Sequence, residues 1–349
     1  MIVTVTPNPA LDLTWHVAAL SSGGTHRAHA GQVRAGGKGL NVARVAHAQG
    51  ASALAVTTAG GATGGEFSAE LQASGVPHVL VPVAAPTRRS IALVDESLGD
   101  TTIVNEYGDA PSLPEWAALR EAVETALARG AGGADAAGAD AGGAGVLVIS
   151  GSLPPATPED LLPSLIRLGR TAGATVIVDT SGAALLAAAD AGASVLKPNE
   201  HELRDATGLD DPIDGARELL RRGAELVLLS LGAAGMLAVS AAPASPAPGG
   251  SGAETDAGNG PGLSILHARL DAPLAGNPTG AGDAGVAACA VLMDAGIRDP
   301  EQILRRATAW SAAAVLMPLA GEIHTSWPEL ERALAVTVSD TAPDPKEDR

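Results

Sequence analysis

The segment Val146-Leu-Val-Ile-Ser150 is a continuous apolar run that ends in a serine, and helical spacing of apolar residues follows it near 158–172. The same order recurs with the runs Thr175–Asp179, Val195–Lys197 and Leu226–Ser230, which are separated by further helical stretches. Strands that alternate with helices predict crossover units, and runs this apolar are typical of strands with both faces covered. We therefore expect an α/β fold with a mostly parallel central sheet flanked by helices.

Outward from this segment, the N-terminal part of the chain predicts both core strands and exposed strands. The alternating, β-branched run Met1–Thr6 predicts a further strand, and Gly39–Gln49 has helical apolar spacing. The stretch 12–36 mixes polar and apolar positions and predicts short exposed strands. Two more strands, Ser90–Val94 and Thr101–Asn105, are joined by a tight turn.

The composition limits the partners that the chain can bind. Its 349 residues carry a formal net charge of −17, and 46% are hydrophobic but only 2% aromatic. Small aliphatic side chains must therefore fill the core. A strongly acidic chain lacks the positive field that nucleic acid or an anionic membrane requires, so we expect neither as a partner. Local cations must bind any anionic substrate.

The single cysteine, Cys289, allows no intrachain disulfide, and its place between two alanines predicts a small buried side chain. The N-terminus has no basic region typical of a signal peptide, and no run reaches the ~18 apolar residues of a membrane helix. We expect a cytoplasmic protein.

Two stretches of low complexity, 130–145 and 241–262, contain too little large apolar surface to order themselves. The alternation of strands and helices resumes after each of them. We therefore interpret both as surface insertions in a single domain over residues 1–338, and we expect the tail 339–349 to be disordered.

The segment Gly280-Ala-Gly-Asp-Ala-Gly285 precedes a predicted helix at 284–295. It matches the dinucleotide pattern G-x-G-x-x-G, but no hydrophobic strand leads into it, and Asp283 would meet the pyrophosphate. Backbone N–H groups at the helix N-terminus can instead stabilise an anion, while Asp283 accepts a proton from a nucleophile held beside it. A structural interpretation, in which Asp283 only stabilises the helix N-terminus, remains open.

Other turns at strand ends carry polar residues where open α/β sheets bind ligands. Gly36-Gly-Lys-Gly39 offers flexible backbone, a helix N-terminus and a cation, although it is not a Walker A loop. Lys197-Pro-Asn-Glu-His-Glu202 presents an amide and carboxylates that could order Mg²⁺ and its waters, and a helix cap at Asn199 explains the segment equally well. The turns Ser150–Pro155 and Ser230–Gly235 occupy similar positions.

Ten segments together resemble the PfkB/ribokinase family of sugar kinases, and in particular its 1-phosphofructokinase and tagatose-6-phosphate kinase branch. They occur in the family's order: Thr6–Asp12, Gly36–Arg44, Gly60–Gly64, Thr87–Arg88, Asn105–Glu106, Ser150–Pro155, Asp179–Gly182, Lys197–Glu202, Ser230–Gly232 and Gly280–Asp283. Any one of these motifs is weak evidence, whereas ten in order are specific.

The resemblance implies a Rossmann-like ribokinase fold with a small β-sheet lid from residues near 12–36 and 87–107. It implies ATP-dependent, Mg²⁺-assisted phosphorylation of a hydroxyl of a sugar monophosphate to a bisphosphate. Fructose 1-phosphate is the expected substrate, with fructose 6-phosphate and tagatose 6-phosphate as the other candidates. Lids of this family often pair, which implies a homodimer.

The resemblance also implies roles for individual residues. Asp283 would be the general base, and Gly280, Ala281 and Gly282 would form the anion hole. Asp12 and Asn41 would bind sugar hydroxyls, and the substrate phosphate would be held by Lys38, Arg88 and Arg27, with Gly37 and Ser152 beside them. The ATP site would comprise Lys197, Asn199, Glu202, Ser230, Gly232 and Gly235, of which Asn199 and Glu202 would tune Mg²⁺ through water.

The sequence departs from the family pattern at Ala284 and Gly285, at Tyr107 and in the turn Leu319–Glu322. Two alternative functions therefore stay open. A kinase for an uncharged sugar or nucleoside would have no use for the cations on the substrate side. A non-catalytic sugar-phosphate sensor would have no use for Asp283 as a base.

Overall fold

The computed structural model describes residues 1–132, 145–242 and 262–338. Residues 133–144, 243–261 and 339–349, which hold most of the two predicted insertions and the predicted tail, lie outside the described residues. The chain divides into two compact units. Unit 1 comprises Met1–Val176 with Leu319–Glu322, and unit 2 comprises Ile177–Pro318 with Ile323–Arg349. The single domain over 1–338 stays a prediction.

Unit 1 contains strands of both sheets and four helices within the described residues. In chain order they are β1 (Ile2–Thr6), β2 (Ala10–Val17), β3 (Gln32–Gly36), α1 (Lys38–Ala48), β4 (Ala53–Gly60), α2 (Gly61–Ala73), β5 (His78–Val83), β6 (Arg88–Asp95), β7 (Asp100–Asn105), α3 (Leu113–Gly132), β8 (Val146–Ser150) and α4 (Leu161–Thr171). Strand β9 (Thr175–Asp179) crosses the boundary between the units.

Unit 2 continues with alternating helices and strands and ends in a helical segment followed by a strand. Its described elements are α5 (Ala183–Asp190), β10 (Val195–Leu196), α6 (Glu200–Thr207), α7 (Pro212–Arg222), β11 (Leu226–Ser230), the 3₁₀ turn η1 (Gly232–Ala234), β12 (Met236–Ala241), β13 (Leu263–Arg269), α8 (Ala281–Asp294), α9 (Pro300–Val315), α10 (Trp327–Ala333) and β14 (Ala335–Val338).

The strands of the described chain form two sheets. The larger has the order β14-β13-β12-β11-β10-β9-β8-β1-β4-β5, and the smaller has the order β3-β2-β6-β7. The pairs β1–β4, β1–β8, β4–β5, β9–β10 and β10–β11 are parallel. Every residue of β1 and β8 is buried, and because alternate side chains point to opposite faces, both faces of these strands are covered. The predicted α/β fold is therefore confirmed.

The core of unit 1 joins the smaller sheet to the helices beside it. Phe67 of α2, the only phenylalanine in the chain, is fully buried with Leu71 against Leu11 of β2, Ala35 of β3 and Leu40 of α1. Cores need volume-filling side chains, and this one is built from aliphatic residues around a single ring. The cluster holds β2 and β3 in place.

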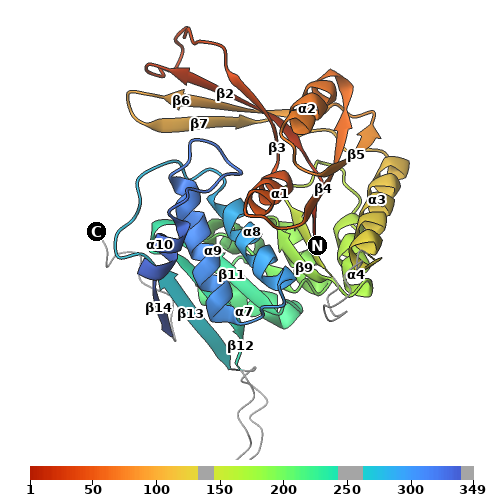
Figure 1. Cartoon of the computed structure of the whole chain (residues 1–349), viewed down its shortest axis with the longest axis vertical. Helices are drawn as coiled ribbons and strands as arrows, with labels where there is room; N and C mark the ends of the chain where they lie inside the picture. Colours follow the sequence, from red (N-terminus) through yellow and green to blue (C-terminus); the bar gives the residue numbers. More distant parts are fainter. Residues whose placement is uncertain (133–144, 243–261, 339–349) are drawn as a thin grey trace, which may run out of the picture. The chain divides into compact units, whose positions relative to one another are not determined.

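The smaller sheet has two unlike faces. Paired residues on neighbouring strands share a face. One row across the four strands, the apolar row, consists of Val33, Leu13, Ile91 and Val104. The adjacent row on the opposite face, the polar row, consists of Arg34, Asp12, Ser90 and Asn105. Figure 1 shows β2, β6 and β7 side by side in this sheet.

The strands at the end of unit 2 are the antiparallel part of the predicted, mostly parallel sheet. The pairs β11–β12, β12–β13 and β13–β14 are antiparallel. Strand β5, the strands β12–β14 and the helices α9 and α10 were not anticipated. Helix α8 begins earlier than predicted, at Ala281 instead of 284.

As predicted, Cys289 is fully buried, and burial raises the pKa of its thiol to about 12. No helix in the described residues has the length and hydropathy to span a bilayer.

Candidate active site

Asp12 lies in the middle of the polar row of unit 1, opposite Arg34 of β3 and Ser90 of β6. Its carboxylate lies against the α-carbon of Gly36, where an added Cβ would overlap it. Burial raises the pKa of Asp12 to about 6, and Arg88, Arg34 and other nearby charges only partly oppose the increase. The site therefore holds a carboxyl group that titrates close to neutral pH.

Arg88 is held next to Asp12 by backbone acceptors. Its Nη1 donates to the carbonyl of Glu106 at 3.2 Å, and its Nε donates to the carbonyl of Asn8 at 3.4 Å. Burial lowers the pKa of the guanidinium, opposed mainly by Asp12 and then by Glu106. Arg88 is thus a cation with a fixed orientation, partly removed from water.

Asn8 links three segments of unit 1, and the sequence reasoning did not assign it a role. Its Nδ2 donates to the Ser152 hydroxyl at 3.2 Å and to the Tyr107 carbonyl at 3.0 Å. A Cβ at Gly108 would lie 2.7 Å from Asn8 Oδ1, so the chain must have glycine there. The signal that could have found Asn8 is its position inside the Thr6–Asp12 motif.

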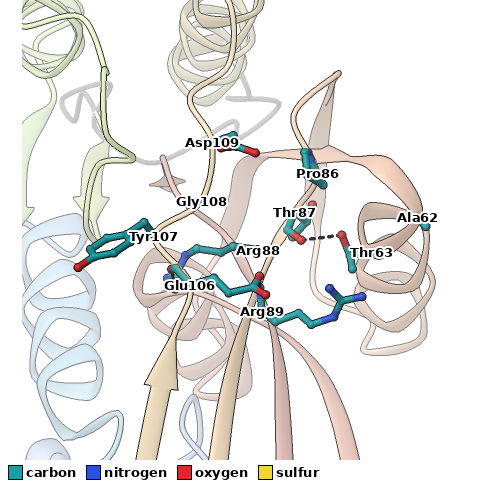
Figure 2. Close-up of a pocket in the computed structure, with 10 residues that line it drawn as sticks. All are labelled: Ala62, Thr63, Pro86, Thr87, Arg88, Arg89, Glu106, Tyr107, Gly108 and Asp109. Carbon is teal, nitrogen blue, oxygen red and sulfur yellow. Dashed lines mark hydrogen bonds between the residues drawn. The ribbon is translucent and has the colours of Figure 1, made fainter.

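A cavity of about 530 Å³ adjoins Arg88 (Figure 2). It is lined by Ala62, Thr63, Pro86, Thr87, Arg88, Arg89, Glu106, Tyr107, Gly108 and Asp109. The Thr63 hydroxyl donates to the Thr87 carbonyl at 2.6 Å, which ties α2 to the strand β6 that carries both arginines. In Figure 2 the Arg89 side chain extends towards α2, whereas Arg88 lies beside Glu106 and Tyr107. The cavity therefore contains both signs of charge.

The glycine-rich turn before α1 packs directly on β1. Gly37 has φ 120°, and a Cβ there would lie 2.6 Å from the Thr6 methyl group. Lys38 is the first residue of α1. A Cβ added at Gly151 would lie 3.9 Å from the Cβ of Lys38, so Lys38 lies next to the turn that contains Ser152. Asn41 is buried one turn further along α1.

The structure thus gathers most of the predicted substrate residues in one part of unit 1. Asp12, Arg88, Ser152 and Lys38 belong to segments that contact one another through Asn8, Gly36 and Gly151. Arg27 differs, because it is exposed in the segment between β2 and β3. Among the described residues no hydrogen bond joins Arg27 to this group.

In unit 2, Asp283 lies in the first turn of α8 and is 5% exposed. Gly280 precedes the helix with φ 84°, a left-handed conformation that glycine adopts without strain. The N–H of Ala281 donates to the Pro278 carbonyl at 3.1 Å, so that amide already has an acceptor. A Cβ at Gly282 would lie 3.2 Å from the Lys197 ammonium, which brings a buried cation beside the same turn.

Asn199 and Glu202 form a capping box at the start of α6. The Asn199 side chain accepts from the Glu202 N–H at 2.8 Å, and the Glu202 carboxylate accepts from the Asn199 N–H at 2.9 Å. The two predicted roles of this segment, a helix cap and a Mg²⁺ site, therefore involve the same side-chain oxygen atoms. The structure confirms the cap, and the metal role stays a prediction.

The predicted nucleotide residues of β10 and β11 lie close together. The Ser230 N–H donates to the Pro198 carbonyl at 3.1 Å, and Ser230 pairs with Asn199 in a parallel bridge. Gly232 opens η1, and Gly235 has φ 95° with its α-carbon against the Ala268 carbonyl of β13. The fold therefore requires glycine at position 235 whether or not a nucleotide binds there.

The described residues contain no group of three or more histidine, cysteine, aspartate or glutamate side chains that could cage a metal ion. Mg²⁺ commonly binds through one or two carboxylates, water and substrate phosphates. Asn199 and Glu202 fit that pattern, because an oxygen that caps a helix keeps a second lone pair.

Comparisons with known proteins connect this geometry to a family. A family model described as pfkB family carbohydrate kinase matches residues 6–326. The 1-phosphofructokinase of Xanthomonas campestris pv. campestris is 33% identical over 318 residues, which cover 88% of this chain and 89% of that protein. The ATP-dependent 6-phosphofructokinase isozyme 2 of Mycobacterium tuberculosis is 34% identical over 242 residues, covering 68% and 67%.

Among solved structures, the chain is similar to phosphofructokinase-2 from Escherichia coli in complex with fructose-6-phosphate. The TM-score is 0.75 with 29% sequence identity, and the match covers 95% of this chain and 98% of that one.

Proposed function

Since the chain belongs to the pfkB family of carbohydrate kinases, we propose that it transfers the γ-phosphoryl group of ATP to a hydroxyl of a sugar monophosphate. Fructose 1-phosphate is the substrate we favour, because the relative named 1-phosphofructokinase aligns over a larger share of the chain than the 6-phosphofructokinase does. Fructose 6-phosphate and tagatose 6-phosphate are the other candidates.

Unit 1 supplies the sugar-phosphate site in this proposal. Lys38 and Arg88 bind the phosphate that the sugar already carries, and they supply the local positive charge that a chain of net charge −17 needs for an anionic substrate. Asp12 and Asn41 bind sugar hydroxyls. Ser152 is oriented by Asn8, whose amide donates to its hydroxyl oxygen at 3.2 Å. Gly37 keeps the backbone close to the sugar, and the exposed Arg27 adds a further cation.

Unit 2 supplies the transfer chemistry. The substrate hydroxyl oxygen attacks the γ-phosphorus, the bond to the bridging oxygen of ADP breaks, and the hydroxyl proton passes to the Asp283 carboxylate. The N–H groups of Gly280 and Gly282 stabilise the migrating phosphoryl group at the N-terminus of α8, while the Ala281 N–H between them holds the turn through the Pro278 carbonyl. The observation that carries the proposal is a buried carboxylate in the first turn of a helix that a left-handed glycine precedes.

Lys197, Ser230, Gly232 and Gly235 hold the ATP phosphates in this scheme. Mg²⁺, when bound, neutralises charge on those phosphates. Glu202 and Asn199 would hold it through water, which fits their donor oxygens and their place in the cap of α6.

The experiment that tests the function is an ADP-release assay with fructose 1-phosphate, fructose 6-phosphate, tagatose 6-phosphate and fructose. We expect the monophosphates to release ADP and fructose to release none at comparable concentration. Turnover of fructose alone would favour a kinase for uncharged sugars. A thermal shift with the monophosphates but no ADP release from any of them would favour a sensor.

The general base is tested by Asp283→Asn, with Asp294→Asn at the other end of α8 as the matched control. We expect the first variant to lose about 10²- to 10⁴-fold in kcat with substrate binding largely preserved, because a positioned base contributes about that factor. The control should keep wild-type kcat. Near-normal turnover of Asp283→Asn would refute the assignment.

We also propose that the protein forms a homodimer through the smaller sheet. The apolar row supports this, since Val33 is 46% and Val104 is 55% exposed at its two ends. A second copy of the same row would cover these side chains, as expected for a self-complementary interface.

A further inference from the structure

Arg34 is a half-buried arginine that neither the motifs nor the proposed reaction accounts for. It lies in the polar row directly opposite Asp12, and its side chain is 17% exposed. Its Nη2 pairs with Glu322 Oε1 at 3.1 Å, whereas its Nη1 is buried without a hydrogen-bond partner among the described residues. A buried, unpartnered guanidinium nitrogen is costly, and its retention calls for an explanation.

Glu322 lies in the turn Leu319–Glu322, where the sequence departs from the family pattern. The turn belongs to unit 1 and closes over the start of α1, because a Cβ at Gly321 would lie 3.1 Å from Asn41 Oδ1. The departure is therefore matched by an ion pair that fixes one end of Arg34, whose strand position is directly opposite Asp12.

The charges around Asp12 come from four elements. They are Arg88 of β6, Arg34 of β3, Arg44 of α1 and Glu70 of α2. Arg44 is balanced locally, since its Nη2 lies 2.8 Å from Glu70 Oε2 and also donates to the Ala35 carbonyl. Arg34 and Arg88 each face a second carboxylate besides Asp12, namely Glu322 and Glu106.

We propose that Arg34 is a positioning residue for Asp12, whose charge keeps the Asp12 carboxylate ionised so that it can accept hydrogen bonds from the sugar hydroxyls. The inference rests on the proposed function, which assigns those hydroxyls to Asp12. Glu322 anchors Arg34 and partly screens its charge.

Burial holds the pKa of Asp12 above its usual range, so the fraction of ionised carboxylate near neutral pH depends on the cations that face it. Its pKa is already raised to about 6, and Arg34 opposes a further increase. Removal of the Arg34 charge therefore raises the pKa of Asp12. When the solution is acidified, Asp12 then becomes protonated, and loses its ability to bind the sugar, at a higher pH than in the wild type. At alkaline pH the carboxylate is ionised with or without Arg34.

The test is the pH profile of kcat/KM for the best sugar monophosphate at saturating ATP. In Arg34→Gln we expect the acid limb to move up by about one pH unit, the low end of the effect of a neighbouring opposite charge. That shift corresponds to a loss of about fivefold at pH 6 and less than about twofold at pH 8. Arg34→Lys, which keeps the charge, should restore most of the wild-type profile.

Arg305→Gln is the matched control, because Arg305 is a half-buried arginine of α9 that pairs with Glu301 at 3.1 Å, and the proposed reaction gives it no role. The pH profile of this control variant includes the titration of the substrate phosphate, and it should coincide with the wild-type profile. An Arg34→Gln limb that coincides with the wild type, or a loss that is equal at every pH, would overturn the proposal.

Glu322→Gln gives an independent test of opposite sign. It leaves Arg34 in place but removes its counter-ion, so the acid limb should move to lower pH. A limb that stays or moves up contradicts the proposal, and this variant decides if Arg34→Gln does not fold. Calorimetric titration at pH 7 adds a second readout, since substrate binding to Arg34→Gln should release more protons than binding to Arg305→Gln.

The two proposals fail in different ways. If the wild type neither binds nor phosphorylates any monophosphate, the proposed function fails. If the wild type is active and the acid limbs do not respond to Arg34 or Glu322, only the present inference fails.

Discussion

The missing side chain of Gly36 leaves the space that the Asp12 carboxylate fills. Its φ lies outside the left-handed region, so alanine there is compatible with the backbone but displaces Asp12. We expect Gly36→Ala to raise KM for the sugar phosphate at least about tenfold, because a displaced carboxylate loses a charged hydrogen bond worth more than about 1.4 kcal/mol. Steady-state kinetics and a melting curve measure the two effects separately.

Gly65→Ala is the control for that substitution. No atom lies within 4 Å of a Cβ built at Gly65, which is an exposed position inside α2. This change should leave KM unaltered and stabilise the helix by about 0.5–1 kcal/mol. An unchanged KM in Gly36→Ala would show that the position of Asp12 is irrelevant to binding.

At the scale of the element, α6 combines a structural cap with a predicted metal role. Asn199→Ala removes the acceptor for the Glu202 N–H and should cost about 1 kcal/mol of unfolding free energy. Glu202→Gln keeps the capping box, since glutamine also serves at that position, but removes the charge. If Glu202 tunes Mg²⁺, this second variant should need several-fold more Mg²⁺ for half-maximal activity while its melting temperature stays near wild type.

Asp211→Ala supplies the matched comparison for the cap. Asp211 caps α7 by accepting from the Ile213 and Asp214 N–H groups, and the proposal gives it no metal role. It should lose stability as Asn199→Ala does without any change in the Mg²⁺ requirement. Should Glu202→Gln respond to Mg²⁺ as the wild type does, Glu202 is a cap only.

At the scale of the whole molecule, the proposed homodimer depends on the apolar row. We expect wild-type protein to elute at the mass of a dimer in light-scattering measurements at micromolar concentration. Val104→Asp should shift the protein to the monomer, because no partner in an apolar interface would offset the desolvation free energy of a buried carboxylate. Leu98→Asp is the control, since Leu98 is 77% exposed in the turn before β7 and outside the row. A dimer that survives Val104→Asp would place the contact elsewhere.

Prediction from the sequence worked best where structure depends on near neighbours. The apolar runs β8, β9 and β11 and the helices between them were predicted because the periodicity of 5–15 residues reports burial directly. Strand β12 follows β11 after the short turn η1, and it was missed although its pairing with β11 is local. Strands β13 and β14 were missed, since the pairing of β13 with β12 and β14 joins segments far apart in the chain. Asn8 escaped notice for the same reason, because its partners Ser152 and Tyr107 are distant in sequence.

Local sequence patterns are enough to predict the α/β class, the net negative charge that demands local cations, and the glycine turn that places Asp283 in the first turn of α8. The position of Arg34 opposite Asp12 and its ion pair with Glu322 arise only when the chain folds. Strand register and loop closure bring such residues together, and neither is encoded in the spacing of one segment. The protonation of Asp12 follows from that packing, because burial and neighbouring charge set its pKa.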